Sequence, residues 1–126
     1  MTPYLLDTQA LLWWAFDPKQ LSDDARIAIA DGRSYVFVSA ATAWEISIKR
    51  RLGKLHAPGC VRQLLKDNRF LQLPVSFEHA EATEHLPLHH KDPFDRLLVA
   101  QAKADRLTLI TRDRDIQKYD VPMIAA

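Results

Sequence analysis

Short apolar runs that alternate with segments of helical pattern constrain the fold of this chain more than any other feature of its sequence. Three runs are clear: Pro3-Tyr4-Leu5-Leu6, Tyr35-Val36-Phe37-Val38 and Leu107-Thr108-Leu109-Ile110-Thr111. Each has the length and the predominantly apolar composition of a strand that is buried on both faces of a parallel sheet. Strands that alternate with helices favour an α/β fold. We therefore expect a central parallel sheet of four to five strands, flanked by helices.

Capping and breaking residues delimit the other elements. Asp17-Pro18 and Gly53 are expected to end helices, Ser22 is a favoured N-cap, and Asp92 precedes a proline at the first helical position. The predicted helices cover about residues 8–16, 22–30, 40–52, 60–67, 76–86 and 93–105, with a short one over 114–119. The predicted strands cover 3–7, 35–39, 107–111 and 121–125, and residues 70–73 form either a short strand or a loop.

Length and composition describe an ordinary globular protein. The 126 residues suit one domain that spans 1–126. The net charge of +1, from 17 basic and 16 acidic residues, neither requires nor excludes a nucleic-acid partner. Only three glycines are present, so a glycine-rich phosphate loop is absent from the sequence. The commonest nucleotide-binding motifs are thereby excluded.

The sequence predicts a cytoplasmic protein without a membrane span. Cys60 is the single cysteine, which excludes an intramolecular disulfide and fits a reducing compartment. We expect this cysteine to be a small buried apolar residue. The first residues lack the basic and long apolar regions of a signal peptide. No apolar stretch approaches the roughly 18 residues of a membrane helix.

Four acidic residues fall at strand ends or on the core side of a helix. Asp7 and Asp113 follow the first and third apolar runs, Glu45 lies on the helix after the second run, and Asp95 shares a helix face with Leu98. An unpaired buried charge costs several kcal/mol, and a shared divalent cation would offset this cost. Oxygen-only ligands suit Mg²⁺ or Mn²⁺ rather than zinc. We therefore expect a magnesium or manganese site.

Each of these acidic residues also has an ordinary structural interpretation. Asp7 and Asp113 could be N-caps of the helices that follow them. Asp95 could form a reciprocal capping box with Asp92, which is compatible with a metal-binding role. Glu45 could pair with the lysine four positions later on its helix. The argument for a metal site therefore rests on the four residues together.

Other candidate residues carry weaker signals. Asp92 and Asp115 are reserve carboxylates beside the four. His89-His90 lacks the cysteine or further spaced histidine of a zinc site. The pair Trp13-Trp14, like Trp44, is expected in the core or in an interface.

The dense basic stretch from Lys49 to His56 has two interpretations. It is either a solvated helix face or a contact for a nucleic-acid backbone, whose affinity comes largely from neutralised phosphates. The candidate contacts within it are Arg50, Arg51 and Lys54, and Arg112 beside the third apolar run could extend the same surface.

At these residues the chain resembles PIN-domain ribonucleases, specifically the VapC-like toxins of bacterial type II toxin–antitoxin pairs. The matching segments occur in order over essentially the whole chain. They are Leu-Leu-Asp-Thr at 5–8, Ser-Ala-Ala-Thr-Ala-Trp-Glu-Ile at 39–46, Asp-Pro-Phe-Asp-Arg-Leu-Leu-Val-Ala-Gln-Ala at 92–102 and Leu-Ile-Thr-Arg-Asp at 109–113. Each segment alone is weakly specific, and the set is fairly specific.

The resemblance implies a Mg²⁺- or Mn²⁺-dependent endoribonuclease of single-stranded or looped RNA. It makes Asp7 and Asp95 the firmest metal ligands and lets Asp113 complete the site or hold a second metal. It implies that Glu45 binds metal through water or positions the attacking water. It also implies a homodimer that is silenced by a cognate antitoxin.

Two other function classes remain open at this point. A receiver domain of a two-component system also has an acidic pocket at strand ends. However, it needs an adjacent acidic pair after the first strand, where this chain has Asp7 followed by Thr8, and a lysine at its last strand, which residues 121–126 lack. The second alternative is a PIN-like module that binds RNA or protein without catalysis, against which the complete acidic quartet argues.

Overall fold

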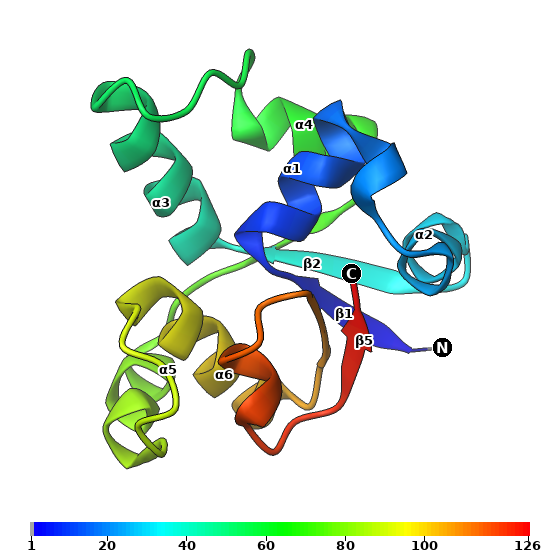
Figure 1. The fold of residues 1–126 in the computed structure, drawn as a ribbon. Helices are drawn as coiled ribbons and strands as arrows, with labels where there is room; N and C mark the ends of the chain where they lie inside the picture. Colours follow the sequence, from blue (N-terminus) through cyan, green and yellow to red (C-terminus); the bar gives the residue numbers. More distant parts are fainter. Residues whose placement is uncertain (1) are drawn as a thin grey trace.

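A five-stranded parallel sheet forms the centre of the computed structural model, which describes residues 2–126 (Figure 1). Its strands are β1 (Pro3–Leu6), β2 (Tyr35–Ser39), β3 (Leu71–Leu73), β4 (Thr108–Thr111) and β5 (Met123–Ala125). Their order is β3-β2-β1-β4-β5, and every neighbouring pair is parallel. The predicted α/β fold with a parallel sheet of four to five strands is therefore confirmed, and residues 71–73 are a strand.

Six α-helices surround the sheet. They are α1 (Thr8–Phe16), α2 (Asp23–Ala30), α3 (Ala40–Arg51), α4 (Val61–Asp67), α5 (Phe77–Ala82) and α6 (Pro93–Asp105). Three 3₁₀ turns complete the structure, at Pro18–Gln20, Thr83–His85 and Ile116–Lys118. The helix predicted over 76–86 is thus α-helical only to Ala82, and the short helix predicted over 114–119 is a 3₁₀ turn.

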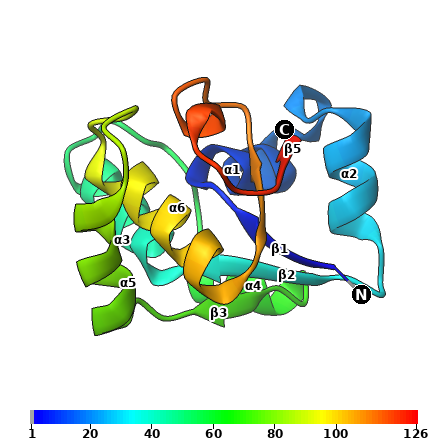
Figure 2. The same ribbon diagram turned by 90° about the horizontal axis from the view of Figure 1, so that it is seen from below.

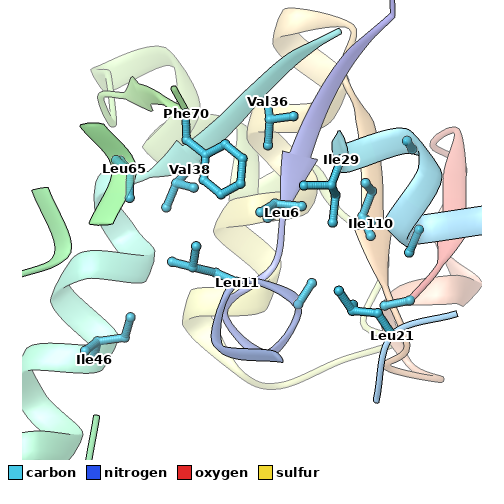
Figure 3. Close-up of a cluster of buried hydrophobic side chains, with 14 residues drawn as sticks. Leu6, Leu11, Leu21, Ile29, Val36, Val38, Ile46, Leu65, Phe70 and Ile110 are labelled. Carbon is cyan, nitrogen blue, oxygen red and sulfur yellow. The ribbon is translucent and has the colours of Figure 1, made fainter. Parts of the chain in front are cut away.

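Two apolar cores lie on opposite faces of the sheet. Leu6, Val38 and Ile110 belong to the core under α1, α2 and α4, which Figure 3 shows. Leu5 and Leu109 belong to the core under α5 and α6. Figures 1 and 2 show these helices on the two sides of the strands. Because successive side chains of a strand point to opposite faces, the apolar runs are buried on both sides.

The strand order creates a switch point beside β1. After β1 the chain extends the sheet through β2 to β3, and the segment with α5 and α6 then brings it back to β4 on the other side of β1. Ligands of open α/β sheets bind beyond the carboxyl ends of strands at such a reversal. The residues after β1 and β4 and the first turn of α6 are therefore the region in which to seek a site.

One prediction about a single residue differs from the structure. Cys60, predicted to be buried, is exposed. It occupies the N-cap position of α4, where the chain enters the helix, and Leu65 is the residue of α4 that faces the core. Of the tryptophans, Trp14 packs against Phe70 at 6.1 Å between ring centroids, whereas Trp44 is 62% exposed. No helix within residues 2–126 is long and apolar enough to cross a membrane.

Candidate active site

A cleft of about 400 Å³ opens at the carboxyl ends of β1 and β4. Its lining includes all four carboxylates of the predicted quartet and a fifth, Asp92. The lining residues are Asp7, Thr8, Gln9, Leu12, Trp13, Glu45, Lys49, Asp92, Asp95, Arg112 and Asp113. The structure thus brings the quartet together in one cleft, whereas the role of each member as a metal ligand stays a prediction.

Asp7 joins the central strand to the first helix and is 5% exposed. Its N–H donates to the Ile110 carbonyl at 3.1 Å, which extends the pairing between β1 and β4. Its Oδ1 accepts the Ala10 N–H at 2.7 Å and caps α1, so the capping interpretation is correct. Burial raises the pKa of Asp7 to about 6, although hydrogen bonds from Thr111 and Ala10 oppose the shift. The Asp7 carboxylate therefore caps α1 and also places a buried ionisable group beside the cleft.

Asp95 lies in the first turn of α6, and its N–H donates to Asp92 Oδ1 at 3.0 Å. The reciprocal half of the predicted capping box is absent from the described residues. The Asp92 N–H donates instead to His90 Nδ1 at 3.3 Å, and Asp95 Oδ2 faces His90 Nε2 at 2.9 Å. Burial, followed by the charge of Asp92, raises the pKa of Asp95 to about 7. The Asp95 side chain is therefore directed to the cleft and not to the backbone.

Glu45 enters the cleft from α3 and is 6% exposed. Thr8 Oγ1 donates to its Oε1 at 2.7 Å, and Lys49 Nζ lies 2.7 Å from its Oε2. The predicted pair with the lysine four positions later is thus present, and this contact raises the pKa of Lys49. Both oxygens of Glu45 therefore have a protein partner, and the role of this residue towards a metal stays a prediction.

Asp113 divides its two carboxylate oxygens between the backbone and the cleft. Oδ1 accepts the N–H groups of Asp115 and Ile116 at 2.8 and 2.9 Å, which fixes the turn after β4. Oδ2 lies 3.4 Å from His90 Nε2. The reserve residue Asp115 instead pairs with Lys118 at 3.1 Å, and that contact lowers the pKa of Asp115.

His90 is a site residue whose place sequence reasoning missed. The sequence argued against a zinc site at His89-His90 and gave His90 no other role, whereas the structure inserts its ring between Asp95 and Asp113, with 16% of the side chain exposed. Its position two residues before the N-cap of α6 could have shown that it lies near the first turn of that helix. Its direction depends on contacts distant in sequence, which no local pattern reveals.

Arg96 holds the loop that carries His90 and Asp92. Its guanidinium donates to four carbonyl oxygens and one hydroxyl: Thr83 O at 2.7 Å, Pro87 O at 3.0 Å, His90 O at 3.3 Å, Leu86 O at 3.4 Å and Tyr119 Oη at 3.1 Å. Tyr119 Oη in turn donates to Pro87 O at 2.8 Å. The planar fork of arginine suits such multiple bonding, so the loop is fixed against α6.

The four candidate nucleic-acid contacts do not share one location. Arg50, Arg51 and Lys54 lie at or beyond the last turn of α3, outside the cleft lining, where positive charge also favours the helix dipole. Arg112 does line the cleft. Its guanidinium lies 4.3 Å from the centroid of the Trp13 ring, and its Nε donates to Ala126 O at 2.7 Å.

The residues of the cleft fit a hard divalent cation. Two carboxyls of raised pKa, Asp7 and Asp95, lie beside further carboxylates, so a bound cation would favour their ionised forms. Carboxylate oxygens are the donors that Mg²⁺ and Mn²⁺ prefer. The chemistry of this donor set agrees with the predicted metal.

Comparison with known proteins identifies the class that this fold and cleft define. Residues 4–122 match the PIN domain family. The chain is 30% identical to Ribonuclease VapC22 of Mycobacterium tuberculosis over 97% of its own length and 95% of that protein. The chain therefore belongs to the PIN domain family, which excludes the receiver-domain alternative. A shorter match, to Ribonuclease VapC16 of the same organism, is 38% identical over 46% of this chain and 43% of that protein.

Solved structures agree with the fold. A TM-score of 0.72 relates the chain to VapBC2 from Rickettsia felis bound to a promoter DNA fragment, at 13% identity over 98% of both chains. The VapBC-5 toxin–antitoxin structure from Mycobacterium tuberculosis gives 0.65 at 22% identity over the whole of both chains. Likeness at these identities supports the fold alone.

The raised pKa of Asp7 predicts how stability depends on pH. Because the folded state holds this proton to about pH 6 and an unfolded aspartic acid only to about 3.8, ionisation of Asp7 destabilises the fold as pH rises through that window. Asp7→Asn keeps the oxygen that caps α1 and removes the charge. In EDTA, urea unfolding should show a gain of about 1–3 kcal/mol at pH 8 that vanishes near pH 4.

Asp115→Asn is the matched control for this experiment. Because Lys118 lowers the pKa of Asp115, the loss of this charge should destabilise the protein at pH 8. A destabilised Asp7→Asn variant at pH 8 would contradict the assignment of an unfavourable buried charge to Asp7.

Proposed function

We propose that this protein is a Mg²⁺- or Mn²⁺-dependent endoribonuclease, the toxin of a type II toxin–antitoxin pair. The observation that carries the proposal is the convergence of Asp7, Glu45, Asp95 and Asp113 on one cleft at the switch point of the sheet. The family membership supports it, as do the relatives named ribonucleases and the similar structures described as toxin–antitoxin complexes.

The side chains of the cleft divide the work of phosphodiester hydrolysis. Asp7, Asp95 and the free oxygen of Asp113 bind the cation, and Asp92 adds negative charge beside them. When bound, the cation supplies a water of lowered pKa and stabilises charge on the phosphate. Glu45, held by Thr8 and Lys49, orients the attacking water.

RNA reaches this cleft as a single strand or a loop, because the recess must admit a splayed backbone. Lys49 and Arg112 supply positive charge in the lining of the cleft, and Arg50, Arg51 and Lys54 extend it along and beyond α3. A cytoplasmic location fits this substrate.

Removal of one carboxylate charge should abolish cleavage without loss of the fold. Purified protein should cut total RNA with Mg²⁺ or Mn²⁺ and stop in EDTA. Asp95→Asn should lower the rate by roughly 100-fold or more, since even residues around a metal's ligands contribute 10–100-fold. Asp24→Asn, on the exposed side of α2, is the control.

The new RNA ends are mapped to show cleavage, and circular dichroism shows whether each variant is folded. Cleavage at full rate in EDTA would falsify the metal dependence. A wild-type protein that binds RNA without cutting it would support the non-catalytic alternative.

The basic end of α3 should contribute to RNA affinity. Arg50→Ala combined with Arg51→Ala should weaken binding and reduce the salt dependence, because each lost phosphate contact lowers the logarithmic salt slope by about 0.7 for single strands. Lys19→Ala with Arg33→Ala removes the same charge from exposed positions elsewhere. Equal affinities and salt slopes in the wild type and the α3 variant would make this stretch a solvated helix face or a protein interface.

A small antitoxin and a second copy of the chain are the proposed protein partners. The cleft is negative, and arginine is the residue best suited to pair bidentately with its carboxylates. Trp13 in the cleft lining and the exposed Trp44, whose ring lies 5.2 Å from that of Phe94, offer apolar surface to a partner helix. The homodimer follows from the family resemblance and is measurable by analytical ultracentrifugation.

We expect an antitoxin that places an arginine near Asp7, Asp95 and Asp113. Co-expression with the neighbouring small open reading frame should yield a co-purifying complex without ribonuclease activity. The chain expressed alone should arrest growth, and Asp95→Asn should not. If no neighbour binds and growth is unaffected by the wild type, the toxin proposal fails even where RNA cleavage stands.

A further inference from the structure

The ring of His90 lies closer to the carboxylates of the cleft than its place in the sequence suggests. Nε2 is 2.9 Å from Asp95 Oδ2 and 3.4 Å from Asp113 Oδ2. The atom is buried, yet it makes no hydrogen bond of acceptable geometry to any described residue. The short distances therefore come without alignment, which places Nε2 beside two carboxylates without a bond to either.

The backbone of His90 is fixed independently of the cleft. Its N–H donates to Tyr119 Oη at 3.1 Å, and its carbonyl accepts from Arg96 at 3.3 Å. Arg96 also donates to Tyr119 Oη at 3.1 Å, which closes a small network around the loop. The backbone from which the ring projects is thus held by Arg96 of α6 and by Tyr119, which follows the 3₁₀ turn after β4.

The other ring nitrogen determines what Nε2 can do. Nδ1 accepts the Asp92 N–H at 3.3 Å. A neutral imidazole has one acceptor and one donor nitrogen, so the proton resides on Nε2, the atom that lies beside Asp95 and Asp113. A histidine that binds a metal has the opposite arrangement, in which the free nitrogen donates to an outer acceptor. His90 therefore offers the cleft a hydrogen-bond donor and not a metal ligand.

We propose that His90 is a positioning residue, whose Nε2–H lies beside the Asp95 and Asp113 carboxylates and holds them together electrostatically for the binding of a divalent cation. The inference rests on the metal dependence of the proposed function. Neighbouring carboxylates repel each other, and the positive end of an N–H dipole beside both reduces that repulsion. Outer residues that orient ligands typically change metal affinity by 10–100-fold.

Two substitutions separate the donor at Nε2 from the acceptor at Nδ1. The amide nitrogen of Gln reaches the place of Nε2, so His90→Gln keeps the donor. Asn ends near the place of Nδ1, so His90→Asn keeps the acceptor for the Asp92 N–H and loses the donor.

Mn²⁺ affinity is measured at pH 8 from the electron paramagnetic resonance signal of the free ion. His90→Asn should weaken it by about 10-fold or more, and His90→Gln by less than about 3-fold.

Electron spin-echo measurements on the Mn²⁺ complex of the wild-type protein add a test that needs no variant. We expect no coupling between Mn²⁺ and an imidazole nitrogen. A nitrogen coupling that disappears in His90→Gln would make His90 a ligand and overturn the proposal. The exposed His56, changed to Asn, serves as the control and should retain wild-type affinity.

The outcomes distinguish this inference from the proposed function. Wild-type protein that binds no Mn²⁺ would overturn both. Equal Mn²⁺ affinities of the wild type and His90→Asn would overturn the role of His90 alone and leave metal-dependent cleavage intact. The thermal unfolding of each metal-free variant is measured beside its Mn²⁺ titration. Weaker Mn²⁺ binding is assigned to the positioning role of His90 only where the variant unfolds at the same temperature as the wild type.

Discussion

The packing of β1 between β2 and β4 is the constraint on which the rest of the structure depends. Leu5 and Leu6 are both fully buried and face opposite cores, so a slip of the strand by one residue would disturb the packing of both cores and move Asp7 from its place. Asp7 follows at once and is tied to the Ile110 carbonyl. The same burial that holds the sheet together therefore places a carboxylate at the edge where the chain reverses direction.

Structural and functional interpretations of the acidic residues prove to be compatible. Asp7 and Asp113 each use one oxygen to accept backbone N–H groups, which leaves the second oxygen for the cleft. Glu45 likewise makes the helical pair expected of it while it lines the cleft. A residue that caps a helix at the end of a strand is held rigidly by that task, which is what a precisely placed charge requires.

The sequence predicted features that local chemistry determines and missed those that depend on distant contacts. Apolar runs located the strands, and Ser22 and Asp92 were correctly identified as caps. The place of the His90 backbone depends on Tyr119, which lies 29 residues away. The exposure of Cys60 depends on which side of α4 meets the core, and a helix of seven residues carries too little periodicity to decide that.

Arg96 shows how a nearly neutral chain can keep a strongly anionic recess. It is the next residue after Asp95, and a count along the sequence would treat the two charges as cancelling. Its guanidinium is instead enclosed by loop carbonyls and the Tyr119 hydroxyl. Opposite charges that adjoin along the chain are thus segregated in space, and the net charge of +1 conceals an electrostatic polarity that only the folded molecule possesses.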